Sequence, residues 1–383
     1  MAFPARTIDD LRERQRQGQL RVTTALDFRR RVAARGLAGA YAETDVLAAA
    51  GADFTDQGLV TISLGPADPP LRLRRALLGD LTLEGGFGAG ELCLPIGGGL
   101  GGGSRRGGAH VLADLLAGRE LPLALQGEVT PLHPRRDLVT SIDRRHLGNG
   151  RLVLQRGLVE GGVVAVSSAE GVLASPYGPL LGPYGNALFT GSGARSVGHS
   201  MPGLLGLGPG QPVLVAGAIG QVLGPGSGHQ PGIRRQPGGQ ARAPGASLAL
   251  SAPLLELEPR WLRPAFFEGH GASLLVAVAA PVPLLGERQA RQAAVGDDAL
   301  EVPVLDFSIP RRVRPGFGTV TYAELLAGRI QVDGHRLPVG PACSLRLADE
   351  IADELVQRLR DGRFPLGPAA GLPTVQPPPP LEG

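Results

Sequence analysis

Apolar residues recur at helical spacing in several parts of the chain. The clearest amphipathic helix is predicted over 345–360, because four apolar residues there fall on one face. They are Leu347, Ile351, Leu355 and Leu359. A helix is also predicted to begin at Thr7, a capping residue with two acidic residues in the turn that follows, and to end near Gly18. Shorter helices are predicted over 27–34, 43–50, 110–118, 287–294 and 322–328.

Short apolar runs bounded by glycine and proline predict a sheet-rich centre. Strands are expected at 59–65, 121–129, 152–166, 213–216, 247–257, 272–280 and 302–307. A small hairpin is predicted over 329–337, with its turn at Asp333-Gly334. Glycine and proline are dense between 175 and 245, which indicates loops threaded between short strands. Because no βαβ rhythm is present, we predict an α+β fold: a mixed, β-rich core of short strands with peripheral helices and many Gly/Pro loops.

Length and composition set the domain organisation. The chain has 383 residues, 43% of them hydrophobic, which is enough for a large core. No segment has the composition of a linker, so residues 1–370 are predicted to form a single domain. Residues 371–383 include four consecutive prolines, Pro377 to Pro380, and are predicted to be a Pro-rich disordered tail.

All 38 basic residues are arginine, and this excludes several kinds of chemistry. Without a lysine the chain cannot form a Schiff base with pyridoxal phosphate, nor can it build a Walker A loop. The two cysteines are far apart, so neither a disulfide framework nor a CxxC zinc site is expected. The net charge of +3 is too small to indicate nucleic-acid binding. The polar N-terminus and the lack of a long apolar run predict a cytoplasmic protein that does not bind membranes.

Two short motifs are weak matches to known catalytic loops. The glycine-rich run 85–108 contains GxGxxG at 97–102, but neither a preceding strand nor a suitably placed acid supports a dinucleotide site. A mobile loop is the better interpretation. Residues 198–202 nearly match the GxSxG of serine hydrolases, with Pro202 in place of the last glycine. The seven histidines are widely spaced, and we predict no metal site.

Two arginine clusters follow strand-like runs. His133-Pro-Arg135-Arg136-Asp137 is one, and residues 309–315, with three arginines, are the other. Guanidinium groups bind carboxylates and phosphates through two parallel hydrogen bonds, so either cluster could hold an anionic metabolite. The alternative is that they are surface arginines beside the end of a strand.

Nine stretches, in order along the chain, together resemble the homocysteine-biosynthesis family, the L-aspartate semialdehyde sulfurtransferases. They are 107–111, 133–137, 178–187, 217–220, 228–231, 269–274, 280–284, 304–310 and 321–328. The resemblance extends from about residue 6 to 370. It implies reductive insertion of sulfur into L-aspartate semialdehyde, giving homocysteine, through cysteines that carry sulfur as a persulfide. It also implies a ferredoxin-like iron–sulfur partner protein, while this chain itself is expected to bind no cofactor.

The sequence departs from the family at its cysteines. The resemblance places one family cysteine at Thr55 and the other at Leu132, and neither of these side chains can carry a persulfide. Cys93 lies between glycine-rich stretches and is a candidate substitute thiol, although a packing role is the alternative. Cys343 precedes the last predicted helix, and a packing role is favoured for it.

Three hypotheses follow. The first is a sulfurtransferase with impaired or altered chemistry; the second is a catalytically silent relative that binds an anionic amino-acid-like metabolite or a protein partner. The third is an unrelated transferase or isomerase that uses His133, Asp137 or His229 as acid or base. The candidate catalytic residues are Cys93, His133 and Asp137. The candidate substrate-binding residues are Arg135, Arg136, Asn186, His229 and Ser273.

Overall fold

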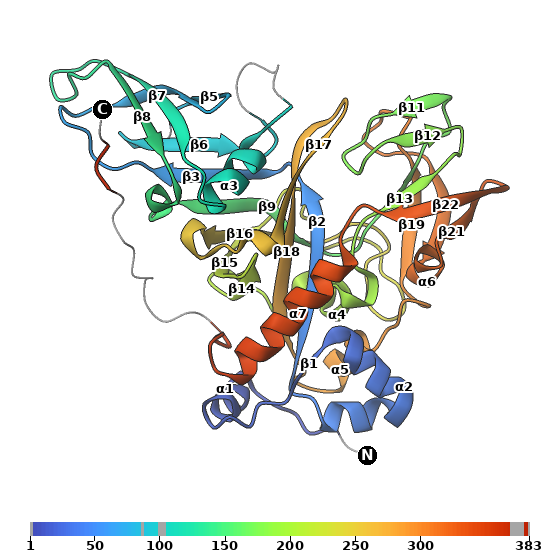
Figure 1. The fold of residues 1–383 in the computed structure, drawn as a ribbon. Helices are drawn as coiled ribbons and strands as arrows, with labels where there is room; N and C mark the ends of the chain where they lie inside the picture. The colour runs from blue at the N-terminus through green and yellow to red at the C-terminus, as the bar shows by residue number, and fades with distance from the viewer. Residues whose placement is uncertain (1–2, 86–87, 99–104, 368–378, 382–383) are drawn as a thin grey trace.

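The computed structural model describes residues 3–85, 88–98, 105–367 and 379–381. Figure 1 shows two β-rich lobes standing side by side above a base of helices. Helices and strands alternate irregularly and the sheets are mixed, so the predicted α+β class is confirmed.

The largest sheet runs through the middle of the molecule and into one lobe. Its strands follow the order β1-β2-β18-β14-β15-β16-β9-β3-β6, and β17 pairs with β18 off this path. The bounds are β1 (Val22–Thr24), β2 (Val46–Thr55), β3 (Gly58–Ser63), β6 (Glu91–Pro95), β9 (Arg151–Val159), β14 (Pro212–Val215), β15 (Ala218–Pro225), β16 (Ser247–Pro253), β17 (Leu262–Phe267) and β18 (Gly271–Pro283).

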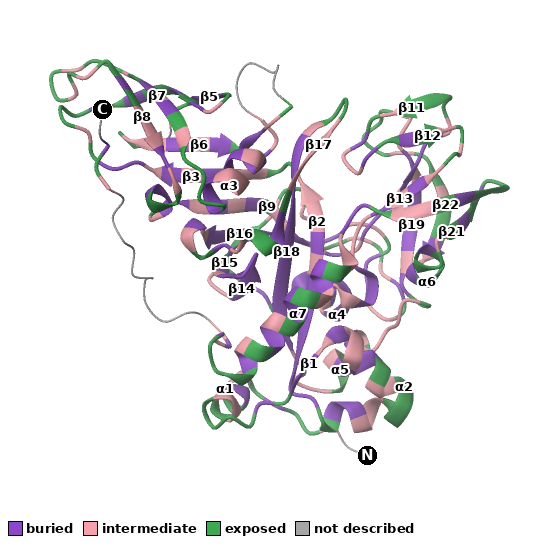
Figure 2. Cartoon of the chain, in the orientation of Figure 1, coloured by how far each residue is buried: buried purple, intermediate pink, exposed green. Residues whose placement is uncertain are grey.

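Strand β18 is the centre of this sheet. All but its two end residues are buried, and Figure 2 shows it as an almost continuous buried band. It pairs antiparallel with β2 over ten positions, from Leu274 opposite Thr55 to Pro283 opposite Val46. A strand covered on both faces needs apolar residues at every position rather than at alternate ones, as this sequence has.

Three smaller sheets complete the fold. The six-stranded sheet of the second lobe has the order β20-β19-β10-β13-β22-β21 and packs around its own cluster of buried side chains. Its strands are β10 (Val164–Val166), β13 (Ala187–Phe189), β19 (Glu301–Asp306), β20 (Gly316–Thr321), β21 (Arg329–Val332) and β22 (His335–Pro341). The order β5-β4-β7-β8 makes a four-stranded sheet and β11-β12 a two-stranded one. These strands are β4 (Leu73–Leu78), β5 (Leu81–Glu84), β7 (Leu121–Gly127), β8 (Asp137–Ile142), β11 (Gly171–Leu173) and β12 (Leu180–Gly182).

The helices lie mostly on the outside of the sheets. They are α1 (Ile8–Arg16), α2 (Ala25–Ala42), α3 (Gly108–Leu116), α4 (Val197–Ser200), α5 (Glu287–Ala293), α6 (Tyr322–Leu326) and α7 (Leu345–Arg360). Helix α7 crosses β2 and β18 with the four predicted apolar residues buried against them (Figure 1). Thr7 caps α1 through a reciprocal bond with Asp10, as its position in the sequence predicts.

One predicted helix is wrong. Residues 43–50 were expected to be helical, yet Val46–Ala50 form the first half of β2. Alanine favours helices, but β1 and β18 flank this segment and α7 covers it, so each of these five residues is fully buried. Burial on both faces outweighs the weak helical preference of alanine.

Parts of two predictions lie outside the described residues. In the glycine-rich run 85–108 these are residues 86–87 and 99–104, which include most of the 97–102 motif, while 91–95 form β6. In the predicted tail only 379–381 are described, and there the Leu381 amide donates a hydrogen bond to the Pro66 carbonyl over 2.9 Å. No helix in the described part of the chain is long and apolar enough to cross a membrane.

Candidate functional site

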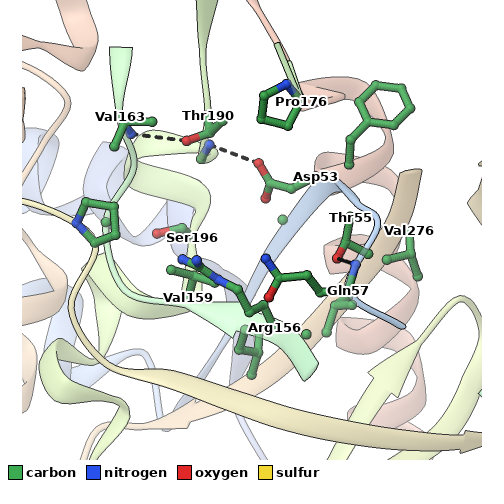
Figure 3. A pocket seen from close by; sticks show the side chains of 18 of the residues that line it. Asp53, Thr55, Gln57, Arg156, Val159, Val163, Pro176, Thr190, Ser196 and Val276 are labelled. Carbon is green, nitrogen blue, oxygen red and sulfur yellow. Dashed lines mark hydrogen bonds between the residues drawn. The ribbon is translucent and has the colours of Figure 1, made fainter. Parts of the chain in front are cut away.

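A cavity of about 380 Å³ lies where β2 and β9 meet the β11–β12 loop and the segment that follows β13. Apolar residues, among them Val159, Val163 and Val276, form part of its wall. Its polar lining residues are Asp53, Thr55, Asp56, Gln57, Arg156, Tyr177, Thr190, Ser196, His199 and His270. These residues come from segments more than 200 positions apart in sequence, and the two lobes meet around them (Figures 1 and 3).

The end of β2 supplies two of these side chains. Asp53 and Thr55 are two positions apart on the strand, so both point to the same face of the sheet. Figure 3 shows both at the cavity, with Asp53 facing the chain segment at Thr190. The Thr55 hydroxyl accepts a hydrogen bond from the Gln57 amide over 3.1 Å, which fixes the turn that follows the strand.

Asp53 is the acidic group best placed to exchange a proton. One carboxylate oxygen accepts a hydrogen bond from the Gly191 amide over 2.9 Å. Burial raises the pKa of Asp53 above its ordinary value, and the Gly191 bond offsets this only in part. Gly51 has no side chain, and a Cβ there would lie 3.2 Å from the second carboxylate oxygen. The strand therefore leaves room beside that oxygen.

Arg156 enters the cavity from β9. Its guanidinium group has no salt-bridge or hydrogen-bond partner among the residues that the structure describes, and it lines the same cavity as Asp53 (Figure 3). Arginine stays charged at any physiological pH and binds carboxylates with two parallel hydrogen bonds. A cation without a carboxylate partner in a partly enclosed cavity is therefore a binding point for an anion.

Tyr177 is another polar residue of the cavity lining. Burial raises the pKa of its hydroxyl, and the charges of Arg156 and Arg314 act in the opposite direction. The phenol therefore stays protonated and can donate a hydrogen bond. On the acidic side, Asp56 lies 3.2 Å from the Nε2 atom of His270.

His199 is a buried, neutral histidine in the cavity wall. Its Nδ1 lies 2.8 Å from the Gly193 carbonyl oxygen; because a carbonyl only accepts, Nδ1 carries the proton. Burial lowers the pKa of the ring, so Nε2 is an unprotonated acceptor. Within the described part of the chain this Nε2 atom has no hydrogen-bond partner.

These groups suit a small zwitterion. The guanidinium of Arg156 matches a carboxylate, and the carboxylates of β2 and the following turn match an ammonium group. Asp53, whose pKa is raised by burial, is the group suited to deliver a proton to a carbonyl oxygen placed between them. Among the described residues no group of three or more His, Cys, Asp or Glu side chains is arranged to hold a metal ion.

The position that the resemblance gives to one family cysteine, Thr55, lies in this cavity; the other, Leu132, does not. Leu132 is 79% exposed at the tip of the loop between β7 and β8. Cys93 lies on β6 opposite Thr61, is half-buried and does not line the cavity. Burial, followed by the negative charge of Glu91, raises the pKa of the Cys93 thiol.

Cys343 lies just behind the cavity wall. Its Sγ donates a hydrogen bond of 3.4 Å to the carbonyl oxygen of Gly191, the residue that binds Asp53. Burial and the nearby Asp53 raise the pKa of this thiol well above its ordinary value. The packing role predicted for Cys343 fits these surroundings.

The other candidate residues are not brought to the cavity. His133, Arg135, Arg136 and Asp137 lie together in and after the β7–β8 loop, where Arg135 donates to the Asp68 carbonyl oxygen over 2.9 Å. The remaining candidates are Asn186, bonded to Pro179 and Leu181; His229, in contact with the Ser247 backbone; and Ser273, buried on β18. Their proposed roles stay predictions.

Most polar cavity residues, among them Asp53, Arg156 and Tyr177, were not candidates in the sequence analysis, and His199 appeared there only within the weak 198–202 motif. A signal exists for two of them. Asp53 is the first charged residue after a long apolar run, and Arg156 interrupts an apolar strand. Charged residues at or inside apolar strands are rare unless they are paired or functional.

Comparison with known proteins places the chain in a family. Residues 20–366 match the family model described as "Homocysteine biosynthesis enzyme, sulfur-incorporation". The chain is 28% identical over 366 residues to the L-aspartate semialdehyde sulfurtransferase of Methanosarcina acetivorans, covering 94% of this chain and 70% of that protein. It is 27% identical over 383 residues to the same-named protein of Methanocaldococcus jannaschii, with 94% and 71% covered. No solved structure matches. The chain belongs to the family of sulfur-incorporating homocysteine biosynthesis enzymes.

Proposed function

We propose that this chain binds L-aspartate semialdehyde in the cavity and takes part in its conversion to homocysteine. The observation that carries the proposal is that two groups line one small cavity. One is Arg156, whose guanidinium has no salt-bridge or hydrogen-bond partner among the described residues, and the other is Asp53, whose pKa is raised by burial. Family membership and the names of the two relatives support the substrate.

The roles follow from charge. Arg156 holds the substrate carboxylate through its two parallel N–H groups, and a carboxylate such as that of Asp56 takes the ammonium group. The aldehyde then lies near Asp53, whose pKa is raised by burial. Asp53 gives its proton to the carbonyl oxygen as sulfur adds to the carbon, so that no free alkoxide forms.

The overall conversion needs two electrons. It is written RCHO + H₂S + 2 e⁻ + 2 H⁺ → RCH₂SH + H₂O: a C–S bond forms, the C–O bond breaks and the oxygen leaves as water. The electrons come from an external reductant, for which we propose a ferredoxin-like iron–sulfur protein. Neither Cys93 nor Cys343 lines the cavity, so the sulfur arrives on another molecule.

The test is growth of a homocysteine auxotroph that carries this gene together with an iron–sulfur reductant. We expect growth with the native chain and with Cys93→Ser, because Cys93 lies outside the cavity. We expect loss of growth with Arg156→Met, and no loss with Arg336→Met, which removes an exposed guanidinium elsewhere. Growth that depends on Cys93, or that survives Arg156→Met in a folded protein, contradicts the assignment.

The second candidate is a silent relative that binds the amino acid without converting it. The absence of a thiol from the described lining of the cavity favours it, together with Thr55 at a position where the resemblance implies a cysteine. It predicts that the purified chain binds an amino-acid semialdehyde in an Arg156-dependent way, yet forms no thiol product from sulfide and a strong reductant.

A further inference from the structure

The arginine loop at 309–315, between β19 and β20, is linked to the cavity through two aromatic rings. Tyr177 lines the cavity, and its ring lies edge-on to Phe307 with the centroids 5.5 Å apart. The guanidinium carbon of Arg314 lies 4.2 Å above the Phe307 ring. Phe307 thus connects Tyr177, in the cavity wall, with Arg314, which does not itself line the cavity.

Arg314 is a partly buried cation for which the described part of the chain offers no salt-bridge partner. It is half-buried, and its Nε atom is buried with no hydrogen-bond partner within the part of the chain that the structure describes. No carboxylate among the described residues forms a salt bridge with it. Stacking on Phe307 fixes the plane of the guanidinium and supplies part of the lost hydration. An unpaired charge in such surroundings raises the free energy of the folded protein, and a bound anion would offset that penalty.

Two separate cations therefore flank Tyr177. Arg156 lies inside the cavity and Arg314 outside the ring, and both charges act on the Tyr177 hydroxyl. One carboxylate of an amino-acid substrate occupies Arg156. Arg314 is left for a second anionic group, which belongs to a second molecule if the substrate is an amino-acid semialdehyde with a single carboxylate.

We propose that Arg314 is the anion-binding end of a second subsite, which holds the carboxylate or phosphate arm of a small organic persulfide, R′SSH, that carries sulfur to the cavity. The S–S bond of the carrier breaks as the C–S bond forms, and the carrier leaves as its thiol: R′SSH + RCHO + 4 e⁻ + 4 H⁺ → R′SH + RCH₂SH + H₂O. The iron–sulfur reductant of the proposed function supplies the electrons, two more than with sulfide because the outer sulfur of a persulfide is more oxidised. This inference rests on the proposed function, because it takes the cavity as the place where sulfur is added. Since no cysteine lines the cavity, the sulfur needs a carrier, and free hydrosulfide would leave Arg314 unpaired.

The half-buried position of Arg314 favours a small ligand over a protein surface. Arg311 and Arg312 in the same loop are exposed and have no salt-bridge partner in the described residues, so an acidic protein would meet these two first. A small anion needs only the half-buried guanidinium of Arg314 on Phe307. A small anionic ligand and an acidic protein partner therefore predict different effects for the same set of variants.

The experiment is isothermal titration calorimetry of the full chain with two inert probes. S-methylglutathione presents carboxylates and cannot transfer sulfur, and inorganic phosphate tests the phosphate alternative. We expect one probe to bind the native protein and to bind roughly tenfold more weakly to Arg314→Met, because a charge-assisted hydrogen-bonded pair is lost. Arg314→Lys keeps the charge but not the planar fork, so an intermediate loss is expected. Arg336→Met serves as the matched control and should bind as the native chain does.

Several results overturn the proposal. One is that neither probe binds the native chain. Another is that a probe binds Arg314→Met as tightly as it binds the native chain. The third is that Arg156→Met loses affinity for the probe while Arg314→Met does not. A loss confined to the double variant Arg311→Met, Arg312→Met would point to an acidic protein partner instead. Thermal unfolding of each variant checks that it is folded. If Arg314→Met does not fold, Arg314→Lys provides the test. Arg156-dependent binding of the amino-acid substrate with no probe binding at Arg314 would sink only this subsite and leave the proposed function standing.

Discussion

The carboxylate of Asp53 accepts a hydrogen bond from the backbone amide of Gly191, over 2.9 Å and across 138 positions of sequence. The bond ties the end of β2 to the loop that follows β13. Gly191 has a φ of 84° and lies against Tyr322, so a side chain there would be strained and would collide with the tyrosine hydroxyl. One buried acid is thereby fixed at the meeting point of the two lobes.

Replacing Asp53 with asparagine should stabilise the protein and abolish its activity. The folded-state pKa of Asp53 lies above the ordinary value of 3.8, so the native state holds the proton more tightly than the unfolded state. The stabilisation from that proton is present at low pH and is lost as pH rises through the folded pKa. At pH 7 the neutral amide avoids a buried charge, and we expect the free energy of unfolding to rise by on the order of 1 kcal/mol.

Chemical denaturation of Asp53→Asn at pH 7 and pH 3.5 measures this effect. The gain in the free energy of unfolding should shrink at pH 3.5, where most of Asp53 is protonated in both the folded and the unfolded state. Asp298→Asn, at an exposed position, should show no comparable gain. A destabilised Asp53→Asn at pH 7 would mean that the ionised form is the one that the fold stabilises.

Gly51→Ala should weaken ligand binding without unfolding the chain. The new Cβ would lie 3.2 Å from an Asp53 oxygen and 3.3 Å from the Ser192 hydroxyl, so both must shift by a few tenths of an ångström. Small displacements of a catalytic group reduce rates strongly, and we expect a roughly tenfold loss of turnover or affinity. Gly208→Ala is the matched control, because a Cβ there meets nothing within 4 Å. Equal activity of the two variants would show that the space beside Asp53 is not used.

His199 should make the fold sensitive to mild acid. Burial lowers its folded-state pKa below the ordinary value of 6.5, so the unfolded state binds the proton more tightly. The contribution of His199 to stability is complete above pH 6.5 and is lost as pH falls below that value. In His199→Gln this part of the pH dependence should disappear.

Denaturation midpoints of the native chain and His199→Gln between pH 7.5 and pH 5 test this point. Their difference should change with pH, whereas His335→Gln, at an exposed position, should follow the native curve. If the difference stays constant across this range, His199 does not change its protonation between the two states.

Thr55→Cys should give the cavity a reactive thiol that the native chain lacks. Position 55 lines the cavity, whereas the raised pKa values of Cys93 and Cys343 keep both native thiols largely protonated at neutral pH. Because the thiolate is the reactive form, both should react slowly with an alkylating agent at pH 7. After sulfide and a mild oxidant, mass spectrometry should find a persulfide on Thr55→Cys and little on the native chain. A persulfide on native Cys93 would restore the view that it is the sulfur carrier.

Periodicity predicted those elements whose determinants are local. Helix α7 follows from four apolar residues on one face, α1 from Thr7 and its first turn, and the β21–β22 hairpin from Asp333-Gly334. Each of these signals lies within a few residues of the structure that it specifies. The resemblance of nine short stretches also identified the family, since it depends on sequence order and not on geometry.

Tertiary structure decided the strand at 46–50 and most of the candidate site. The alanines of β2 became a strand because β18 and β1 flank them and α7 covers them, which no window of local sequence contains. Of the two positions that the resemblance gives to family cysteines, the fold places Thr55 in the cavity and Leu132 outside it, and the substitute thiol Cys93 also lies outside. Asp53, Arg156 and His199 meet only through the pairing of distant strands. The raised pKa of Asp53 and the lowered pKa of His199 come from loss of water on burial, a property of the assembled fold and not of any single residue.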